Sequence, residues 1–369
     1  MRLTTSRDAL FAQLQTVTRA ASTRSAVQAL SGVHVQARAG AIELRATDME
    51  IGLRVPLEGD VIRDGAVVLP ARLLVDVVRA LPTDSVSLEL RPTEQDVELV
   101  SGSATFHLRT LRLEDFPPLP EAETNGRLEI PADAFVETVT KVGRAASRDE
   151  TRPVLTGILV SASGDELRMA ATDSYRLAAK DTRLDSALAS AFEANVPARA
   201  LQELTRIVQH AGADRLSVAL TANQVIFEVG GVLLSSRLID GQFPNVRQLL
   251  PDAYEHELRM AAGEIADVVR RISLLAQKNA PLRLAFAEGE LTVSARTPDV
   301  GEAQESLPVP FQGEPLEIGF NPEFLRDGLD ALEGGDLVLK LISHLRPGLI
   351  QSADDSGFQY LLMPIRLNV

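Results

Sequence analysis

Few side chains in this chain of 369 residues are placed to carry out covalent chemistry. The absence of cysteine excludes a thiolate nucleophile, a thiolate metal site and a disulfide scaffold. The five histidines are isolated, and no pair of them has the spacing of metal ligands. The sequence also contains no GxSxG, GxxxxGK[ST], GxGxxG or HExxH motif. These features favour a protein that binds rather than catalyses, and predict no metal and no cofactor.

Two segments group side chains suited to binding. Thr172-Asp173 follows a predicted strand, where such a pair forms a turn through side-chain to backbone hydrogen bonds. The next residues, Tyr175-Arg176-Leu177, place an aromatic, a cationic and an apolar side chain together at the strand end, although a capped edge strand has the same pattern. The segment 360–369 is apolar up to its last residue, which predicts a strand that continues as the wall of a groove for an apolar peptide.

The elements that must position these segments are repeated along the chain. Arg19-Ala20-Ala21-Ser22 recurs 125 positions later as Arg144-Ala145-Ala146-Ser147, and Ala46-Thr47-Asp48 recurs at the same offset as Ala171-Thr172-Asp173. A fainter third copy follows. Internal repeats at a fixed period indicate an array of similar units. We therefore expect three tandem domains, at residues 1–122, 123–250 and 251–369.

Each domain is predicted to contain two similar halves, each a helix followed by short antiparallel strands. Leu10, Leu14 and Val17 recur at helical spacing, and Pro70 precedes a second helix with an apolar stripe. Residues 33–37 and 42–45 alternate apolar with polar around an Ala39-Gly40 hairpin turn, and His34 is expected to face solvent. The fold class is therefore α+β, with antiparallel sheets.

The charge is unevenly distributed along the chain. The net charge is −14, but the three predicted domains carry −3, −2 and −9. The basic residues recur in place: Arg72 and Arg79 share one helix face, and Arg199 and Arg206 are their counterparts 127 positions later. The recurrence of these basic residues favours a shared basic surface over simple solvated helix faces. Such a surface would contact phosphates without recognising base sequence. We assign to this surface Arg24, Arg72, Arg79, Lys141, Arg148, Arg152, Arg199, Arg206 and Lys278.

Other classes of function remain compatible with these patterns. One is an enzyme that uses carboxylates such as Asp173 and Asp240. Another is a repeat-built scaffold that binds protein peptides but no nucleic acid. No apolar run reaches the length of a membrane span, and the first residues lack a secretory signal, so we expect a cytoplasmic protein.

Three motifs together resemble the bacterial sliding clamp, the beta subunit of the replicative DNA polymerase. They are Ala171-Thr172-Asp173-Ser174-Tyr175-Arg176-Leu177, Asp240-Gly241-Gln242-Phe243-Pro244 and Met363-Pro364-Ile365-Arg366-Leu367, in a three-domain chain. The resemblance implies a non-catalytic, head-to-tail homodimer, a ring of six domains around duplex DNA. It implies as further partners the polymerase III alpha subunit, the clamp loader, and other polymerases and repair proteins.

The resemblance also implies where partner peptides bind. The pocket would lie between the second and third domains, with a gate near Arg152, Asn321 and Phe324. Ser174-Tyr175 departs from the Gly-His common in the family, which raises the alternative of a second clamp copy with an altered pocket. The implied pocket residues are Leu155, Thr172, Ser174, Tyr175, Arg176, Leu177, Pro244, Leu249, Asn321, Phe324, Leu362, Met363, Pro364, Ile365 and Arg366.

The dimer contact implied by the resemblance joins the first domain of one chain to the third domain of the other. Leu74 and Val78 would contact Leu274 and Leu275. Glu302 and Glu305 would be acidic residues on the third-domain side of this contact. Ser103 and Thr105 stand where many members of the family have basic residues.

Overall fold

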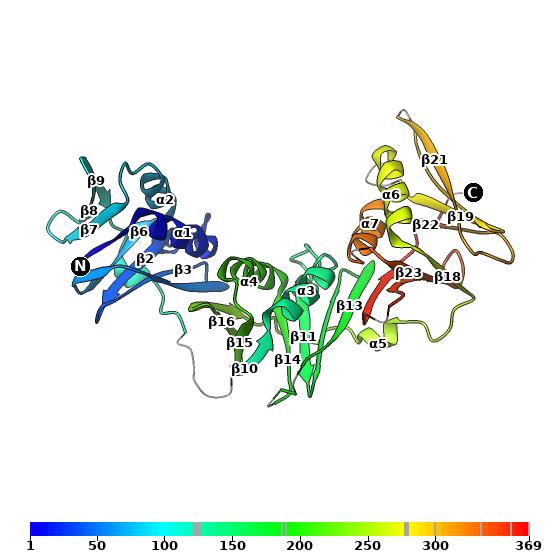
Figure 1. The fold of residues 1–369 in the computed structure, drawn as a ribbon, viewed down its shortest axis with the longest axis horizontal. Coiled ribbons are helices and arrows are strands. Elements are labelled where there is room, and N and C mark those ends of the chain that lie inside the picture. The colour runs from blue at the N-terminus through cyan, green and yellow to red at the C-terminus, as the bar shows by residue number, and fades with distance from the viewer. Residues whose placement is uncertain are drawn as a thin grey trace. The chain divides into compact units, whose positions relative to one another are not determined.

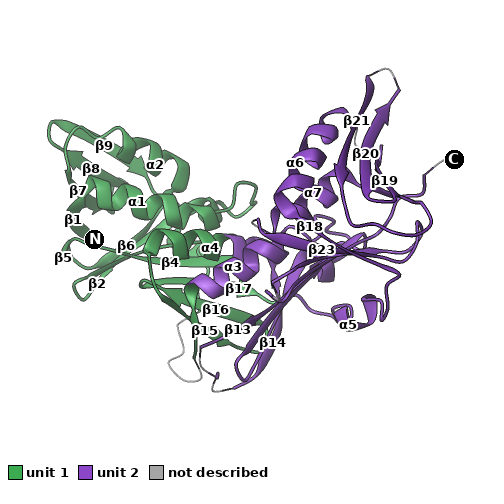
Figure 2. Ribbon diagram, turned by 45° about the vertical axis from the view of Figure 1, so that its right-hand side comes forward, with its two compact units in different colours: residues 1–132, 203–238 green, residues 133–202, 239–369 purple. Residues whose placement is uncertain are grey.

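The computed structural model describes residues 1–120, 127–185, 187–188, 190–276, 280–298, 300–332, 334–354 and 356–367. The chain forms two compact units (Figures 1 and 2). Unit 1 contains Met1–Ala132 and Glu203–Leu238, and unit 2 contains Asp133–Gln202 and Ile239–Val369. Within the described ranges, no helix is both long and apolar enough to cross a membrane.

One element pattern, a strand followed by a helix and three strands, occurs six times in the described chain. The first domain contains β1 (Arg2–Ser6), α1 (Arg7–Val17), β2 (Gly32–Arg38), β3 (Ala41–Thr47) and β4 (Ile51–Leu57), then β6 (Gly65–Pro70), α2 (Ala71–Arg79), β7 (Ser85–Arg91), β8 (Asp96–Ser101) and β9 (Ala104–Arg109), with a short β5 (Asp60–Arg63) between the halves.

The other two domains repeat this order. The second has β10 (Leu128–Pro131), α3 (Ala132–Gly143), β11 (Gly157–Ser163), β12 (Glu166–Thr172), β13 (Arg176–Arg183), β14 (Phe192–Pro197), α4 (Ala198–Ala211), β15 (Arg215–Leu220), β16 (Gln224–Val229) and β17 (Val232–Arg237). A short α5 (Val246–Leu249) leads to the third. That domain has β18 (His256–Ala261), α6 (Ala262–Ile272), β19 (Leu282–Ala287), β20 (Glu290–Thr297), β21 (Gly301–Pro308), β22 (Leu316–Phe320), α7 (Pro322–Asp330), β23 (Asp336–Leu341), β24 (Gly348–Ser352) and β25 (Phe358–Leu362).

Local sequence signals explain the first of these elements. The Ser6 side chain accepts a hydrogen bond from the backbone N–H of Ala9 and so caps α1, whose Leu10, Leu14 and Val17 are buried. Ala39 and Gly40 both have positive φ angles, as a two-residue turn between β2 and β3 requires. The predicted helix face and hairpin are therefore confirmed.

The first strand of each half was not predicted, and it links the two halves of a domain. β1 pairs with β7 of the second half, while β6 pairs with β2 of the first half. The same exchange joins β10 to β15, β14 to β11, β18 to β23 and β22 to β19. Apart from the short α5, each helix named here is thus directly preceded by a strand that pairs into the sheet of the other half.

Two sheets continue from one domain into the next. In unit 1, β17 pairs with β4, which gives an eight-stranded sheet in the order β10-β15-β16-β17-β4-β3-β2-β6. In unit 2, β13 pairs with β25, which gives the order β14-β11-β12-β13-β25-β24-β23-β18. The division between the units therefore falls within the second domain and not at a junction between domains.

One residue differs from its expected position at the level of the fold. His34 is only 8% exposed, because its ring lies against Phe116 with 5.1 Å between ring centroids, so the expectation that it faces solvent was wrong. Burial lowers its pKa to about 4, which keeps the imidazole neutral at pH 7.

The terminal segment forms β25 in the interior of a sheet and leaves it after Leu362, before Pro364.

Packing inside the third domain gives a first prediction. A Cβ atom at Gly328 would lie 2.5 Å from the ring of Tyr360, which is 1% exposed. We expect Gly328→Ala to lower the free energy of unfolding by about 1–3 kcal/mol through overpacking. The matched control is Gly263→Ala on α6, where a Cβ atom has no neighbour within 4 Å. Chemical denaturation checks both variants, and equal stability of the two would contradict the prediction.

Candidate functional site

The segment 172–176 forms a tight turn between β12 and β13. The Thr172 hydroxyl donates to the carbonyl oxygen of Arg176 (2.7 Å), and the Asp173 carboxylate accepts from the backbone N–H groups of Tyr175 and Arg176. Ser174 has a φ of 78°, in the left-handed region. The equivalent turn in the first domain has the same hydrogen bonds, with Met49 at a φ of 79°. The repeated Thr-Asp pair is therefore structural, as predicted.

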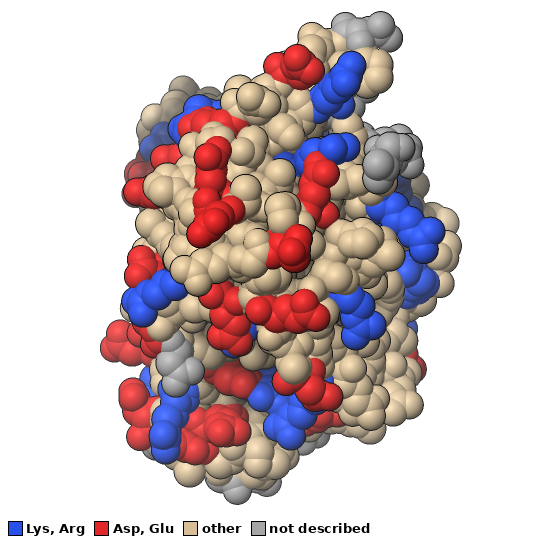
Figure 3. All heavy atoms as spheres, turned by 90° about the vertical axis from the view of Figure 1, so that its right-hand side faces the viewer, with Lys and Arg blue, Asp and Glu red and all other residues tan. Residues whose placement is uncertain are grey.

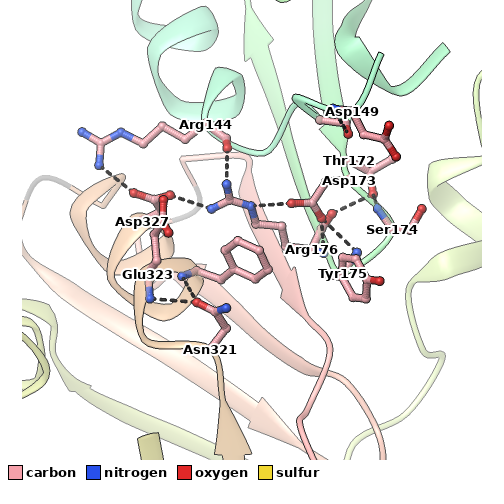
Figure 4. A network of polar contacts seen from close by, with 12 residues as sticks. Arg144, Asp149, Thr172, Asp173, Ser174, Tyr175, Arg176, Asn321, Glu323 and Asp327 are labelled. Atoms are coloured by element: carbon pink, nitrogen blue, oxygen red, sulfur yellow. Dashed lines mark hydrogen bonds and ion pairs between the residues drawn. The ribbon is translucent and has the colours of Figure 1, made fainter. Parts of the chain in front are cut away.

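The guanidinium group of Arg176 is held on several sides (Figure 4). It donates to Asp327 Oδ2 (2.6 Å), to Asp173 Oδ2 (3.1 Å) and to the carbonyl oxygen of Arg144 (2.5 Å). Its carbon lies 4.2 Å from the centre of the Phe324 ring. Because Arg176 and Asp327 come from the second and third domains, this buried group ties the two together inside unit 2.

Electrostatics keep this group charged. Burial by itself lowers the pKa of Arg176, but the contacts with Tyr360, Asp327 and Asp173 raise it above its ordinary value. For the Tyr360 phenol, in contrast, burial raises the pKa, and its hydroxyl donates to the carbonyl oxygen of Phe324 (2.8 Å). The network is therefore an ion pair with its hydrogen bonds satisfied, the condition under which a buried charge is tolerated.

A pocket of about 740 Å³ opens beside this network, entirely within unit 2. Its floor is apolar, since Leu177 and Leu361 pack with Leu349 and are at most 5% exposed. Its wall carries Leu249, Leu345 and Met363, which are 44%, 51% and 45% exposed. Large apolar side chains exposed around a concave site are typical of a surface for an apolar ligand or peptide.

The structure brings seven of the fifteen expected pocket residues to this lining: Thr172, Ser174, Arg176, Leu177, Pro244, Leu249 and Met363. The other eight do not line it. Tyr175 is 60% exposed, and its carbonyl oxygen accepts from the N–H of Met363. Leu362 is buried, Arg366 is exposed, and the rest are half-buried: Leu155, Asn321, Phe324, Pro364 and Ile365.

Asn321 and Phe324 have other roles than the expected gate. The Asn321 side chain accepts from the N–H groups of Glu323 and Phe324 and so caps α7. Arg152 donates to Asp149 Oδ2 (2.9 Å) and to the Ser174 hydroxyl (3.1 Å) at the edge of the pocket. Of these three, Arg152 and Phe324 each touch a residue of the lining, namely Ser174 and Arg176.

Sequence reasoning missed part of the lining and most of the ion network. Residues Gln248 and 250–253 line the pocket, at the expected boundary between the second and third domains. Ile342 and Leu361 come from strands of the third domain. Asp327 and Tyr360 have no local motif that could have linked them to Arg176, because the contacts span 151 and 184 positions.

The chain matches all three domains of the DNA polymerase III beta subunit: the N-terminal domain over residues 1–120, the central domain over 129–245 and the C-terminal domain over 247–366. It is 34% identical to the beta sliding clamp of Synechococcus elongatus and 31% to that of Streptomyces coelicolor, with both chains covered fully in each case. The chain belongs to the beta sliding clamp family. It is thus a non-catalytic subunit, of the α+β clamp fold predicted from the sequence.

Solved structures agree with this assignment. The sliding clamp of Bacillus subtilis superimposes with a TM-score of 0.93 at 29% identity, with both chains covered fully. A sliding clamp from Bartonella birtlesii bound to griselimycin superimposes with a TM-score of 0.92, also at 29% identity and full coverage of both chains.

The cations expected on the DNA-facing surface of the clamp fall into three groups. Seven are exposed: Arg24, Arg72, Arg79, Arg148, Arg152, Arg199 and Arg206. The assignment of Lys141 to this surface was wrong, because its side chain is 9% exposed and its ammonium group lies 2.8 Å from the carboxylate of Glu137. Lys278 lies outside the described residues.

The expected dimer contact needs a correction on the first-domain side. Leu74 and Val78 are both 0% exposed, because the apolar stripe of α2 packs into the core of its own domain, so they cannot meet another chain. Leu73 is 47% exposed on the same helix. On the other side, Leu274 is 82% exposed and Leu275 is half-buried.

The acidic residues expected at this contact differ in their surroundings. Glu302 is exposed, with Arg296 3.9 Å away. Glu305 accepts two hydrogen bonds from Arg271 (2.9 and 2.6 Å), which lowers the pKa of its carboxyl group. Glu305 is therefore already paired within its own chain.

The ion network gives a second prediction. We expect Arg176→Gln to lower the free energy of unfolding by about 3–5 kcal/mol, because it leaves buried Asp173 and Asp327 without their main counter-charge. Arg259→Gln is the matched control, since Arg259 pairs with Asp336 at 2.9 Å while 67% exposed. Chemical denaturation measures both, and a similar small loss in the two variants would contradict a structural role for Arg176.

Proposed function

We propose that two copies of this chain close head to tail into a ring of six clamp domains, divided at residues 122/123 and 250/251. The ring encircles duplex DNA and tethers the replicative polymerase. Its partners are the polymerase III alpha subunit, the clamp loader, and other polymerases and repair proteins, which dock peptides in the pocket beside Arg176. We also infer a cytoplasmic location, since that is where bacterial DNA is replicated.

The observation that carries the head-to-tail dimer is the strand pairing at the domain junctions. At each junction, the last strand in the first half of one domain pairs with the last strand in the second half of the following domain. These pairs are β4 with β17 and β13 with β25. By the same rule β21 would pair with β9, and these are end strands of their sheets. A second copy supplies the missing partner for each, and this contact closes a ring if its rotation is right.

Side chains beside these two end strands support the same contact. Leu274 and Leu275 lie next to β21, and the hydroxyl of Thr297 at the end of β20 donates to the Leu275 carbonyl oxygen. Leu73 is an exposed apolar residue of the first domain. Since Glu305 is paired with Arg271 in its own chain, we infer that apolar contact and strand pairing contribute more to closure than ion pairs between chains.

The distribution of charge supports weak contact with DNA. The seven exposed arginines of the expected surface would meet phosphates, and contacts of this kind do not depend on base sequence. A ring held by topology needs no tight grip, so it slides. Acidic side chains are spread among basic ones over the face shown in Figure 3, where a duplex would gain little from binding.

The alternative of a carboxylate enzyme loses its main support. The carboxylate of Asp173 is occupied by two backbone N–H groups and by Arg176. Among the described residues, no group of three or more His, Asp or Glu side chains is placed to hold a metal ion.

The ring gives a third prediction. We expect the protein, once loaded on nicked circular DNA, to stay bound as salt is raised, because leaving requires the ring to open. Linearising the circle provides a free end and releases it. Gel filtration of the DNA-bound fraction measures both states, and retention that falls with salt equally on circles and linear DNA would exclude a ring.

The pocket gives a fourth prediction. Met363→Asp and Leu249→Asp place a charge on the apolar wall, and we expect each to weaken binding of a polymerase tail peptide at least tenfold. Ile62→Asp is the matched control, because Ile62 is 56% exposed in the first domain, outside the pocket. Fluorescence anisotropy with a labelled peptide measures the affinities. Normal peptide binding by both wall variants would place the docking site elsewhere.

A further inference from the structure

The chain continues beyond the last strand of the third domain as a short segment, residues 363–367, which we call the strap. Its first residue, Met363, belongs to the wall of the pocket beside Arg176 and is 45% exposed. Because β25 ends at Leu362, the position of Met363 depends on contacts outside the ladder of strand hydrogen bonds. Those contacts decide whether this part of the wall is in place when a peptide arrives.

A main-chain hydrogen bond holds the strap on each side of Pro364. The N–H of Met363 donates to the carbonyl oxygen of Tyr175 (2.9 Å), in the turn of the second domain. The N–H of Ile365 donates to the carbonyl oxygen of Gly319 (2.7 Å), in the third domain. Pro364 itself has no N–H to donate, and its ring fixes the φ angle between the two points. The wall residue is thus held between Tyr175 and Gly319.

Gly319 offers the strap a free strand edge. It lies on β22, which is an end strand in the sheet order β21-β20-β19-β22 and pairs with β19 along its other edge. Ile365 forms an isolated antiparallel bridge with Gly319. The strap therefore covers, over one residue pair, an edge that would otherwise present unpaired main-chain groups.

The strap approaches Gly319 too closely for a side chain at that position. A Cβ atom there would lie 2.8 Å from the carbonyl oxygen of Ile365 and 2.6 Å from Leu367 Cδ2. Gly319 lies within a strand and is not among the glycines with a positive φ, so the close approach, and not the backbone conformation, requires glycine. Any side chain at 319 must push the main chain of the strap away from β22.

β22 is a firm support for this contact. Ile318 and Phe320, on either side of Gly319, are 0% and 1% exposed, so the strand is anchored in the core of its domain. Asn321 follows directly and caps α7, from which Asp327 accepts a hydrogen bond of Arg176 (Figure 4). The strand that holds the strap therefore also leads into the ion network beside the pocket.

We propose that Gly319 is a positioning residue for peptide docking: it seats the strap on β22 and thereby holds Met363 at the wall of the pocket. Gly319 and Leu367 do not belong to the pocket lining, so both act through Met363. A wall that is ordered before binding lowers the cost of ordering it when the peptide docks. The inference rests on the proposed function, because it concerns the site at which partner peptides dock.

The first test compares two glycine variants of the full-length protein. We expect Gly319→Ala to weaken binding of a labelled peptide from the C-terminal tail of the polymerase III alpha subunit several-fold, measured by fluorescence anisotropy. Gly32→Ala is the matched control. A Cβ atom at this buried position of β2 would lie 2.5 Å from Val68 Cγ1 and 3.0 Å from the carbonyl oxygen of Leu69, in the first domain.

The control variant is overpacked to a similar degree but is expected to bind the peptide like the wild type. If Gly319→Ala binds normally, or if Gly32→Ala loses as much affinity, Gly319 has no positioning role.

A second variant changes the other side of the same contact and does not depend on tolerance of a new Cβ atom. Leu367 is half-buried near the end of the chain and packs on Gly319, so Leu367→Ala leaves the cores of the domains unchanged. We expect it to weaken peptide binding as well, since the strap loses part of its seat. Unchanged binding by Leu367→Ala would contradict the proposal.

A measurement without peptide separates the strap from the docking function. The chain has five methionines, so the Met363 methyl signal can be assigned in a carbon-edited NMR spectrum by Met363→Leu. We expect this signal to narrow in Gly319→Ala and Leu367→Ala, because the side chain becomes more mobile, and to stay unchanged in Gly32→Ala. An unchanged signal in both strap variants would refute the seat on β22. Failure of the wild type to bind the peptide, with the signals as expected, would instead refute docking in this pocket.

Discussion

Strand pairing across the domain junctions is the constraint on which the rest of this structure depends. Each junction is made by main-chain hydrogen bonds between the last strands of two halves, so it does not require particular side chains. The side chains on either side of a junction are then free to differ. This explains how three domains with faint sequence similarity keep one architecture while only one junction carries the apolar pocket.

The two junctions show what that freedom allows. In unit 2, position 176 is an arginine that contacts Asp173, Asp327 and Phe324. The nearby buried lysines, Lys141 and Lys180, both pair with Glu137. In unit 1 the equivalent position is Ile51, which is 2% exposed and packs as an apolar side chain. One junction is therefore held by buried charges beside a peptide pocket, whereas the other is apolar at this position.

Local patterns predicted the parts of the fold that local physics decides. The 125-residue offset predicted the repeat, and the caps and turns of the first domain lie where Ser6, Ala39 and Gly40 indicated. The partners of Arg176 could not be predicted, because they depend on pairing between distant strands. Leu74 and Val78 were misplaced for a related reason: an apolar stripe indicates burial, but not whether the core or another chain covers it.

Lys141 shows how the same ambiguity affects charge. The recurrence of basic residues assigned it to the shared basic surface, yet β13 brings Lys180 to the carboxylate of Glu137, and both lysines are buried. The basic surface is consequently sparser than the sequence indicated. A sparse surface suits a clamp, because each additional phosphate contact strengthens binding and increases the barrier to sliding. We propose that a few exposed arginines on an acidic chain contact DNA without immobilising it.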